Sequence, residues 1–179
     1  MSYIVPKEEL TITDQYKYRS DAINAAIKRA LELKIATNSG ELNVRSFENI
    51  LDAGTALEQY NTAALAAVGT AYSCFQAVAA PILAANKLAV FYGVAIETTP
   101  SPVSLLTFRS GGAGGNIIAE FDLEQIATCQ VVAGYFSEPV VIDPTRNFAV
   151  QVTARIATGV LARVQLKAFI VEPAGQRIA

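Results

Sequence analysis

The sequence predicts an α+β protein, mainly β, in which an N-terminal arm and helices precede an antiparallel, jelly-roll-like β-sandwich. Short runs of alternating apolar and polar residues, separated by Gly, Pro and Asn, recur from Lys87 to Ala179, as in antiparallel sandwiches and barrels. Helical periodicity is confined to the N-terminal part, unlike the regular alternation of a doubly wound fold. We therefore expect an arm and helical region at 1–70 and a sandwich domain at 71–179.

The N-terminal region predicts an extended arm followed by one clear helix. Residues 1–13 favour an arm because Pro6 interrupts any helix there. The helix is expected to run from about Asp14 or Ser20 to about Ile35, with Ser20 or Asp21 as its cap and Asn38-Ser39-Gly40 as its stop signal. We expect it to pack on a sheet or on another subunit. Its apolar face contains Ile23, Ala26, Ile27, Ala30 and Leu31.

The middle of the chain is ambiguous, and the C-terminal half is a series of strands. We expect a helical or mixed segment at 46–67 and a strand at 72–78, which Pro81 ends. The GGAGG run at 111–115 predicts a flexible loop between strands, and 143–147 predicts a turn. The further strands are expected at 87–96, 103–109, 116–122, 128–135, 140–142, 148–157 and 160–171.

The residue inventory argues against catalysis. The chain has no His, so neither a Ser-His-Asp or Cys-His arrangement nor a histidine-ligated zinc site is available. Cys74 and Cys129 lie in apolar runs and are expected to be buried free thiols, with a single disulfide left open as the alternative. We therefore expect no catalytic residues, no metal site and no cofactor.

Two patterns resemble binding motifs but favour simpler interpretations. The GGAGG loop is followed by Asn116-Ile117-Ile118, not by the Gly-Lys-Ser/Thr of a phosphate-binding loop. Glu120, Asp122 and Glu124 alternate along the chain, which could serve Ca²⁺ or a glycosidase pair but more often marks a solvated strand face.

Charge and hydropathy limit the partners. The net charge is −2 and no basic block occurs, so we expect no direct nucleic-acid binding. No charged residue lies between Glu58 and Lys87, but this stretch is rich in Ala and polar residues and contains Gly69 and Pro81. We therefore expect no transmembrane helix and no membrane partner. The N-terminal sequence lacks the pattern of a signal peptide.

The C-terminal half also resembles a known class of proteins. The segments KLAVFYGVAI, PSPVSLLTFRSGGAGGNIIAEFDLE, GYFSEPVVIDPTRNFAVQV and VQLKAFIVEPAGQ, within about residues 85–176, are similar to small β-sandwich virion proteins of tailed bacteriophages. The resemblance implies a non-enzymatic structural protein located in the virion, such as a capsid decoration, cement or minor head protein. It also implies a homo-oligomer, for which we expect a trimer, in contact with the major capsid protein or other virion proteins.

Low charge and high Ala content suit a subunit that covers much of its surface with neighbours. An alternative function is that of a ligand- or receptor-binding β-module of a tail or fibre, which needs a polar, aromatic-lined pocket. The residues expected to make subunit contacts come from the arm, the helix and the loop. They are Tyr3, Ile4, Val5, Ile23, Ile27, Leu31, Gly111, Gly112, Gly114 and Gly115.

Overall fold

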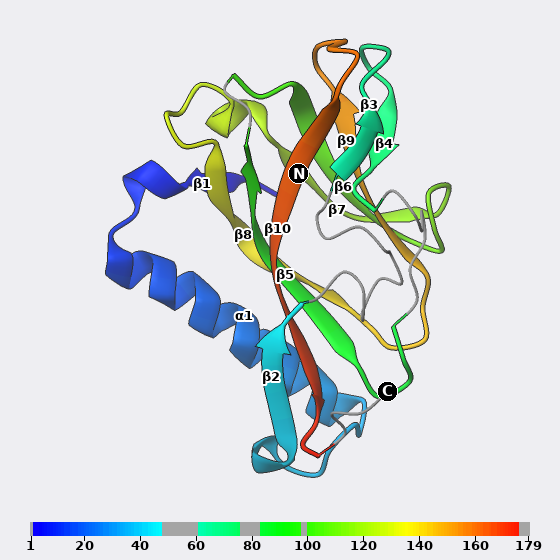
Figure 1. Cartoon of the computed structure of the whole chain (residues 1–179). Coiled ribbons are helices and arrows are strands. Elements are labelled where there is room, and N and C mark those ends of the chain that lie inside the picture. The colour runs from blue at the N-terminus through cyan, green and yellow to red at the C-terminus, as the bar shows by residue number, and fades with distance from the viewer. Residues whose placement is uncertain (1, 48–60, 76–82, 98–99, 176–179) are drawn as a thin grey trace.

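The predicted fold class is confirmed: in the residues that it describes, a computed structural model has one α-helix and two antiparallel sheets stacked as a β-sandwich (Figure 1). It describes residues 2–47, 61–75, 83–97 and 100–175. The first sheet has the order β1 (Ile4–Pro6), β8 (Ala133–Ile142), β5 (Leu88–Ile96), β10 (Leu161–Pro173) and β2 (Leu42–Ser46), and β3 (Asn61–Ala64) also pairs with β10. The second has the order β4 (Ala71–Ser73), β9 (Phe148–Ala154), β6 (Val103–Ser110) and β7 (Asn116–Asp122).

The core lies between the two sheets and is rich in phenylalanine. Phe91 of the first sheet and Phe108 of the second have ring centroids 5.2 Å apart, and Phe121 stacks on Phe136 at 4.0 Å. Alternation places every second residue of a strand on one face. On β10 the core-facing residues are Ala162, Val164, Leu166, Ala168 and Ile170, as the alternation of this segment predicts.

Helix α1 (Ile12–Glu32) covers the outer face of the first sheet (Figure 1). Its fully buried residues are Ala22, Ala26 and Ala30, which are four residues apart and therefore share one stripe of the helix. They form a second apolar cluster with strand residues such as Val90 and Phe169. Because alanine is small, the helix backbone lies close to the sheet, and the helix is part of the chain's own fold.

The helix begins and ends earlier than the sequence predicts. Its N-cap is Thr11, not Ser20 or Asp21. The Thr11 Oγ1 accepts a hydrogen bond from the Asp14 N–H at 3.2 Å, and the Thr11 N–H donates to Asp14 Oδ2 at 3.1 Å, which makes a capping box. The helix ends at Glu32, and Lys34 adopts a left-handed conformation with φ 57°. The predicted stop at 38–40 lies beyond this end, where Asn38 caps the 3₁₀ turn Ser39–Glu41.

Part of the predicted helical or mixed segment is strand. The described parts of 46–67 include β3, and its first residue, Ser46, ends β2. Both strands pair with β10, which is far away in sequence. Pairing with a distant strand overrides local helix propensity there. Residues 48–60 lie outside the described residues, as do residues 76–78 of the strand expected at 72–78, where β4 covers 71–73.

The strands predicted at 128–135 and 140–142 form one strand, β8, which starts only at Ala133. A short 3₁₀ turn, η3 (Glu124–Ile126), precedes it. The register of β8 against β5 changes between Gly93, which pairs with Tyr135, and Phe91, which pairs with Val140. This bulge accommodates Pro139, which cannot donate a ladder hydrogen bond. Residues 136–139, which lie between the two predicted strands, are therefore an irregular part of one strand.

Strands from both predicted segments share the same sheets. From residues 1–70, β1 pairs with β8 while β2 and β3 pair with β10. Ser2 also makes an isolated bridge to Phe121 of β7, so the arm contacts both sheets. The division at residue 70 stays a prediction.

On the first sheet, Glu172 is buried and pairs with Arg45 at 2.9 Å and Lys87 at 3.7 Å.

Candidate contact surfaces

The N-terminal arm is built into the sandwich. Ile4 is only 2% exposed and packs in the main core, whereas Tyr3 is 58% exposed. Gly134 of β8 makes room for the arm, because a Cβ there would overlap Ile4 Cγ2 and lie 2.9 Å from the Val5 carbonyl oxygen. Of the residues expected to make arm contacts, Tyr3 faces solvent and Val5 is half-buried, whereas Ile4 packs inside the chain's own core.

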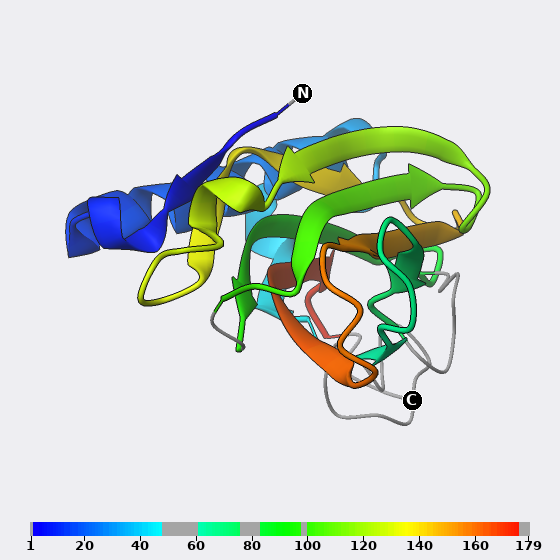
Figure 2. The ribbon, with the colours of Figure 1, turned by 90° about the horizontal axis from the view of Figure 1, so that it is seen from above.

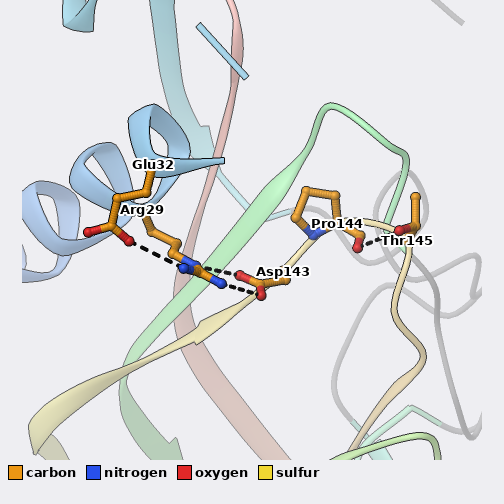
Figure 3. Close-up of polar contacts among 5 residues, drawn as sticks. All are labelled: Arg29, Glu32, Asp143, Pro144 and Thr145. Carbon is orange, nitrogen blue, oxygen red and sulfur yellow. Dashed lines mark hydrogen bonds and ion pairs between the residues drawn. The ribbon is translucent and has the colours of Figure 1, made fainter. Parts of the chain in front are cut away.

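The expected helix contacts lie beside the joint between helix and sheet. Ile23, Ile27 and Leu31 are all half-buried, and Ile23 packs against the second apolar cluster. The helix is fastened near its C-terminal end by Arg29, which hydrogen-bonds to Asp143 just after β8 (Figure 3). The surface that the helix offers to a partner is therefore limited to the flanks and the far side of α1.

The 111–115 loop joins β6 to β7, as the sequence predicts, and is well ordered by hydrogen bonds. The Gly111 N–H donates to the Asn147 carbonyl at 2.7 Å, and the Arg109 guanidinium donates to the Gly115 carbonyl at 2.9 Å. Gly111 and Gly112 have positive φ angles of 82° and 89°, which favour glycine. Gly111 and Gly114 are exposed, Gly115 is half-buried and Gly112 is buried.

Apolar side chains next to this loop are exposed. Ile117 and Ile118 are 53% and 45% exposed, although they follow one another in β7 and so point to opposite faces of the strand. No residue from 110 to 119 is charged. We call residues 110–119 the β6–β7 hairpin surface. Exposed apolar surface of this kind is typical of interaction sites, and the sequence pattern did not reveal Ile117 and Ile118 because the segment reads as an ordinary strand.

A cavity of about 240 Å³ lies between α1 and the first sheet. Tyr135 holds its wall in place, because its hydroxyl donates to Gln15 Oε1 at 3.2 Å and its ring stacks on Tyr18 at 5.4 Å. Burial raises the pKa of Tyr92 and of Tyr135. The sequence does not predict this site, because its residues come from three separate elements. The lining residues are Ile12, Gln15, Tyr16, Arg19, Tyr92 and Tyr135.

Beside this cavity, Lys167 crosses over a glycine to reach an aromatic ring. Its ammonium nitrogen lies 5.2 Å from the centre of the Tyr135 ring, which is a cation–π distance. Gly93 lies between them on β5, and a Cβ there would be 3.0 Å from Lys167 Cδ. Burial, aided by Lys7, lowers the pKa of Lys167.

In the part of the chain that the structure describes, the acidic residues form no metal-binding cluster and the two cysteines form no disulfide. There, no three His, Cys, Asp or Glu side chains are grouped to hold a metal ion. Asp122 instead accepts a hydrogen bond from the Glu124 N–H at 2.8 Å. Cys74 and Cys129 are free; Cys74 is buried, which raises the pKa of its thiol, whereas Cys129 is only partly buried.

No helix among the described residues is long and apolar enough to span a bilayer.

Comparison with known proteins gives only distant structural likeness. No protein family and no curated protein matches the sequence. Among solved structures, the infectious bursal disease virus VP2 subviral particle is similar at 13% identity and a TM-score of 0.43. The structure of the infectious bursal disease virus Gx strain is similar at 13% identity and a TM-score of 0.41. Each match covers 75% of this chain but only 34% and 33% of the other chains, so this chain spans about a third of their length.

Proposed function

We propose that this chain is a non-enzymatic structural protein of a bacteriophage particle, such as a capsid decoration, cement or minor head protein, that acts through subunit contacts. The β6–β7 hairpin surface carries this proposal. It combines an uncharged glycine loop with two exposed isoleucines, Ile117 and Ile118, on an ordered hairpin. A patch without charge loses little solvation when a neighbour covers it.

The hairpin is suited to contact because it is already ordered. Arg109 ties the loop to its own strand and, through Gln151 Oε1 at 3.1 Å, to the neighbouring β9. A surface that is ordered before binding gives up less conformational entropy when a partner arrives. The energy of burying Ile117 or Ile118, which lie on opposite faces of β7, is then available for affinity.

The expected partners are further copies of the chain and the major capsid protein or other virion proteins. Identical subunits usually close into symmetric rings, and a trimer is the assembly that we propose. Tyr3, exposed on the arm, and the 111–115 loop would supply contacts.

Density-gradient purification of particles from a virus-producing culture that encodes this chain would test the proposal. We expect mass spectrometry to find the chain in the particle band at a fixed ratio to the major capsid protein. Ile117→Lys should reduce incorporation at least tenfold, whereas Val131→Lys, at another exposed apolar position, should not. Absence of the wild-type chain from particles would overturn the proposal.

The tyrosine-lined cavity favours a second candidate function, the binding of a ligand or receptor by a tail or fibre module. Its phenol, guanidinium and amide groups from Tyr16, Arg19 and Gln15 could orient a small polar ligand. Glycan-array binding that Tyr16→Ala abolishes would support this function. Array signals that Tyr16→Ala leaves unchanged, or no signal at all, would exclude glycan binding at this site.

A further inference from the structure

Two hairpin loops meet at one end of the molecule and form a surface that sequence patterns do not reveal. One loop, 65–70, connects β3 to β4, and the other, 155–160, connects β9 to β10. Both views of the ribbon place them side by side (Figures 1 and 2). We call residues 65–70 and 156–161 the hairpin-pair tip.

Hydrogen bonds between the two loops make the tip a single ordered unit. The Leu65 N–H donates to the Val160 carbonyl and the Gly159 N–H donates back to the Leu65 carbonyl, both at 3.0 Å. The Gly69 N–H donates to the Ala154 carbonyl at 2.8 Å. Inside the first loop, the Tyr72 hydroxyl oxygen accepts the Ala66 and Ala67 N–H groups at 2.9 and 3.0 Å.

The tip is apolar, exposed and uncharged. Leu65 points into the core and is fully buried, so it anchors the tip from below. Branched aliphatic side chains cover the outside: Val68 is 65% and Val160 is 62% exposed, and Ile156 and Leu161 are each nearly half exposed. No residue in 61–75 or 156–162 carries a charge at neutral pH, although the chain has 30 charged residues from 14 Lys and Arg and 16 Asp and Glu.

We infer that the hairpin-pair tip is an interface with the same tip of further copies of this chain, grouped around a rotation axis; this inference rests on the proposed function as an assembly subunit. Close to such an axis a side chain lies beside its own copies, so a charge at that place would face a like charge. The tip is free of that repulsion. Its Ala and Gly residues leave room between the branched side chains for a neighbouring copy to pack.

The neighbouring residues fit the rim of such an interface. Glu97 and Arg163, which is on β10 just below the tip, form an exposed ion pair at 3.2 Å. Arg155, which begins the second loop, lies 3.9 Å from Glu124. An apolar centre surrounded by polar residues is typical of protein interfaces. A lipid surface fits less well, because anchors at the bilayer boundary use aromatic and basic side chains, and residues 65–70 and 156–161 contain neither.

Sedimentation velocity of the full-length chain over about 1–100 μM tests the tip as a self-contact. We expect the wild-type chain to associate, and Val68→Glu and Val160→Glu each to weaken association at least tenfold, a typical loss at an interface centre. Because the introduced charges repel one another, 1 M salt should restore part of the association. Val131→Glu is the matched control, since Val131 is also exposed but lies outside the tip. Circular dichroism should be unchanged in all three variants, and so should the melting temperature measured at a concentration where every chain is monomeric.

Disulfide trapping gives an independent test. In a Cys129→Ser background, Val160→Cys should form a dimer between chains under mild copper-phenanthroline oxidation, and Val131→Cys should not. Wild-type association that neither tip variant weakens would overturn the tip interface and leave the proposed function intact. A wild-type chain that stays monomeric yet is found in particles would likewise overturn the tip interface and leave the proposed function intact. If the wild-type chain is a monomer that binds phosphatidylcholine vesicles, and Val160→Glu abolishes this binding, the partner of the tip is a lipid surface and not a second copy of the chain.

Discussion

Arg29 and Asp143, 114 residues apart in sequence, form a two-pronged ion pair that fastens α1 to the end of β8 (Figure 3). Arg29 Nε lies 2.9 Å from Asp143 Oδ1, and a terminal guanidinium nitrogen lies 2.8 Å from Oδ2. Hydrogen bonding from Arg29 lowers the pKa of the Asp143 carboxyl. Glu32, one turn on, also pairs with Arg29 at 3.2 Å but only at the solvent-exposed side.

Asp143→Asn is expected to lower the free energy of unfolding by about 1 kcal/mol, because both partners are partly exposed and solvent screens the pair. For a chain of this size the melting temperature should fall by about 2–4 °C. Glu32→Gln is the control and should change stability by less than about 0.5 kcal/mol. Calorimetry of the three proteins at pH 7 measures both values.

The pH dependence of this difference has a definite sign. Because the folded-state pKa of Asp143 lies below its unfolded value of about 3.9, the ionised pair stabilises the fold above that pH. The contribution is lost as the pH falls through the lower, folded-state pKa. Wild type and Asp143→Asn should therefore converge in stability as the pH falls below the folded-state pKa of Asp143. A difference that persists undiminished in acid would contradict the assignment of the pair.

Gly115→Ala is expected to destabilise the β6–β7 hairpin, because its Cβ would overlap the Ser110 carbonyl. A change that forces the backbone to move costs about 2 kcal/mol or more. Gly114 is the matched control, since a Cβ there meets nothing within 4 Å. Urea unfolding should separate the two variants, and equal stability of both would mean that the loop is arranged differently.

Ile4→Ala is expected to cost about 2–4 kcal/mol, because it removes a buried side chain from the main core. Tyr3→Ala, at the exposed neighbouring position, should stay within about 0.5 kcal/mol of wild type. Chemical denaturation measures the difference. If Ile4→Ala were as stable as Tyr3→Ala, the arm would not be part of the folded sandwich in solution.

Glu172→Gln is expected to cost about 3 kcal/mol, because it leaves the cationic groups of Arg45 and Lys87 facing a neutral amide in a buried site. The exposed pair of Glu97 with Arg163 offers the comparison, and Glu97→Gln should cost less than about 0.5 kcal/mol. Equilibrium unfolding in urea checks both values. Similar small losses in the two variants would contradict the burial of Glu172.

Local patterns predicted the features that local chemistry decides. The alternation of β10 and the GGAGG turn were readable because each depends on nearby residues. The face of α1 was predicted in part: Ala26 and Ala30 of the predicted face are buried against the sheet together with Ala22, whereas Ile23, Ile27 and Leu31 are only half-buried. Which stripe is buried depends on how closely the backbones approach.

Features that depend on distant segments were not predictable in this way. The strand β3 is built from Asn61, Thr62 and two alanines, which favour a strand only because β10 lies beside them. The tyrosine-lined cavity and the hairpin-pair tip each require three or more elements to come together. The uncharged stretch after Glu58 was visible in the sequence, but periodicity does not tell that part of it lies at an exposed tip.

The central claim, that this chain works as an assembling subunit, is tested most directly by the mass of the purified chain in solution. Light scattering coupled to size-exclusion chromatography gives that mass without a shape assumption. We predict a defined oligomer, a trimer of about 57 kDa from the 19.0 kDa chain. A monodisperse monomer at every concentration up to about 100 μM would contradict self-assembly of the chain, and its absence from particles as well would shift the function toward binding at the tyrosine-lined cavity.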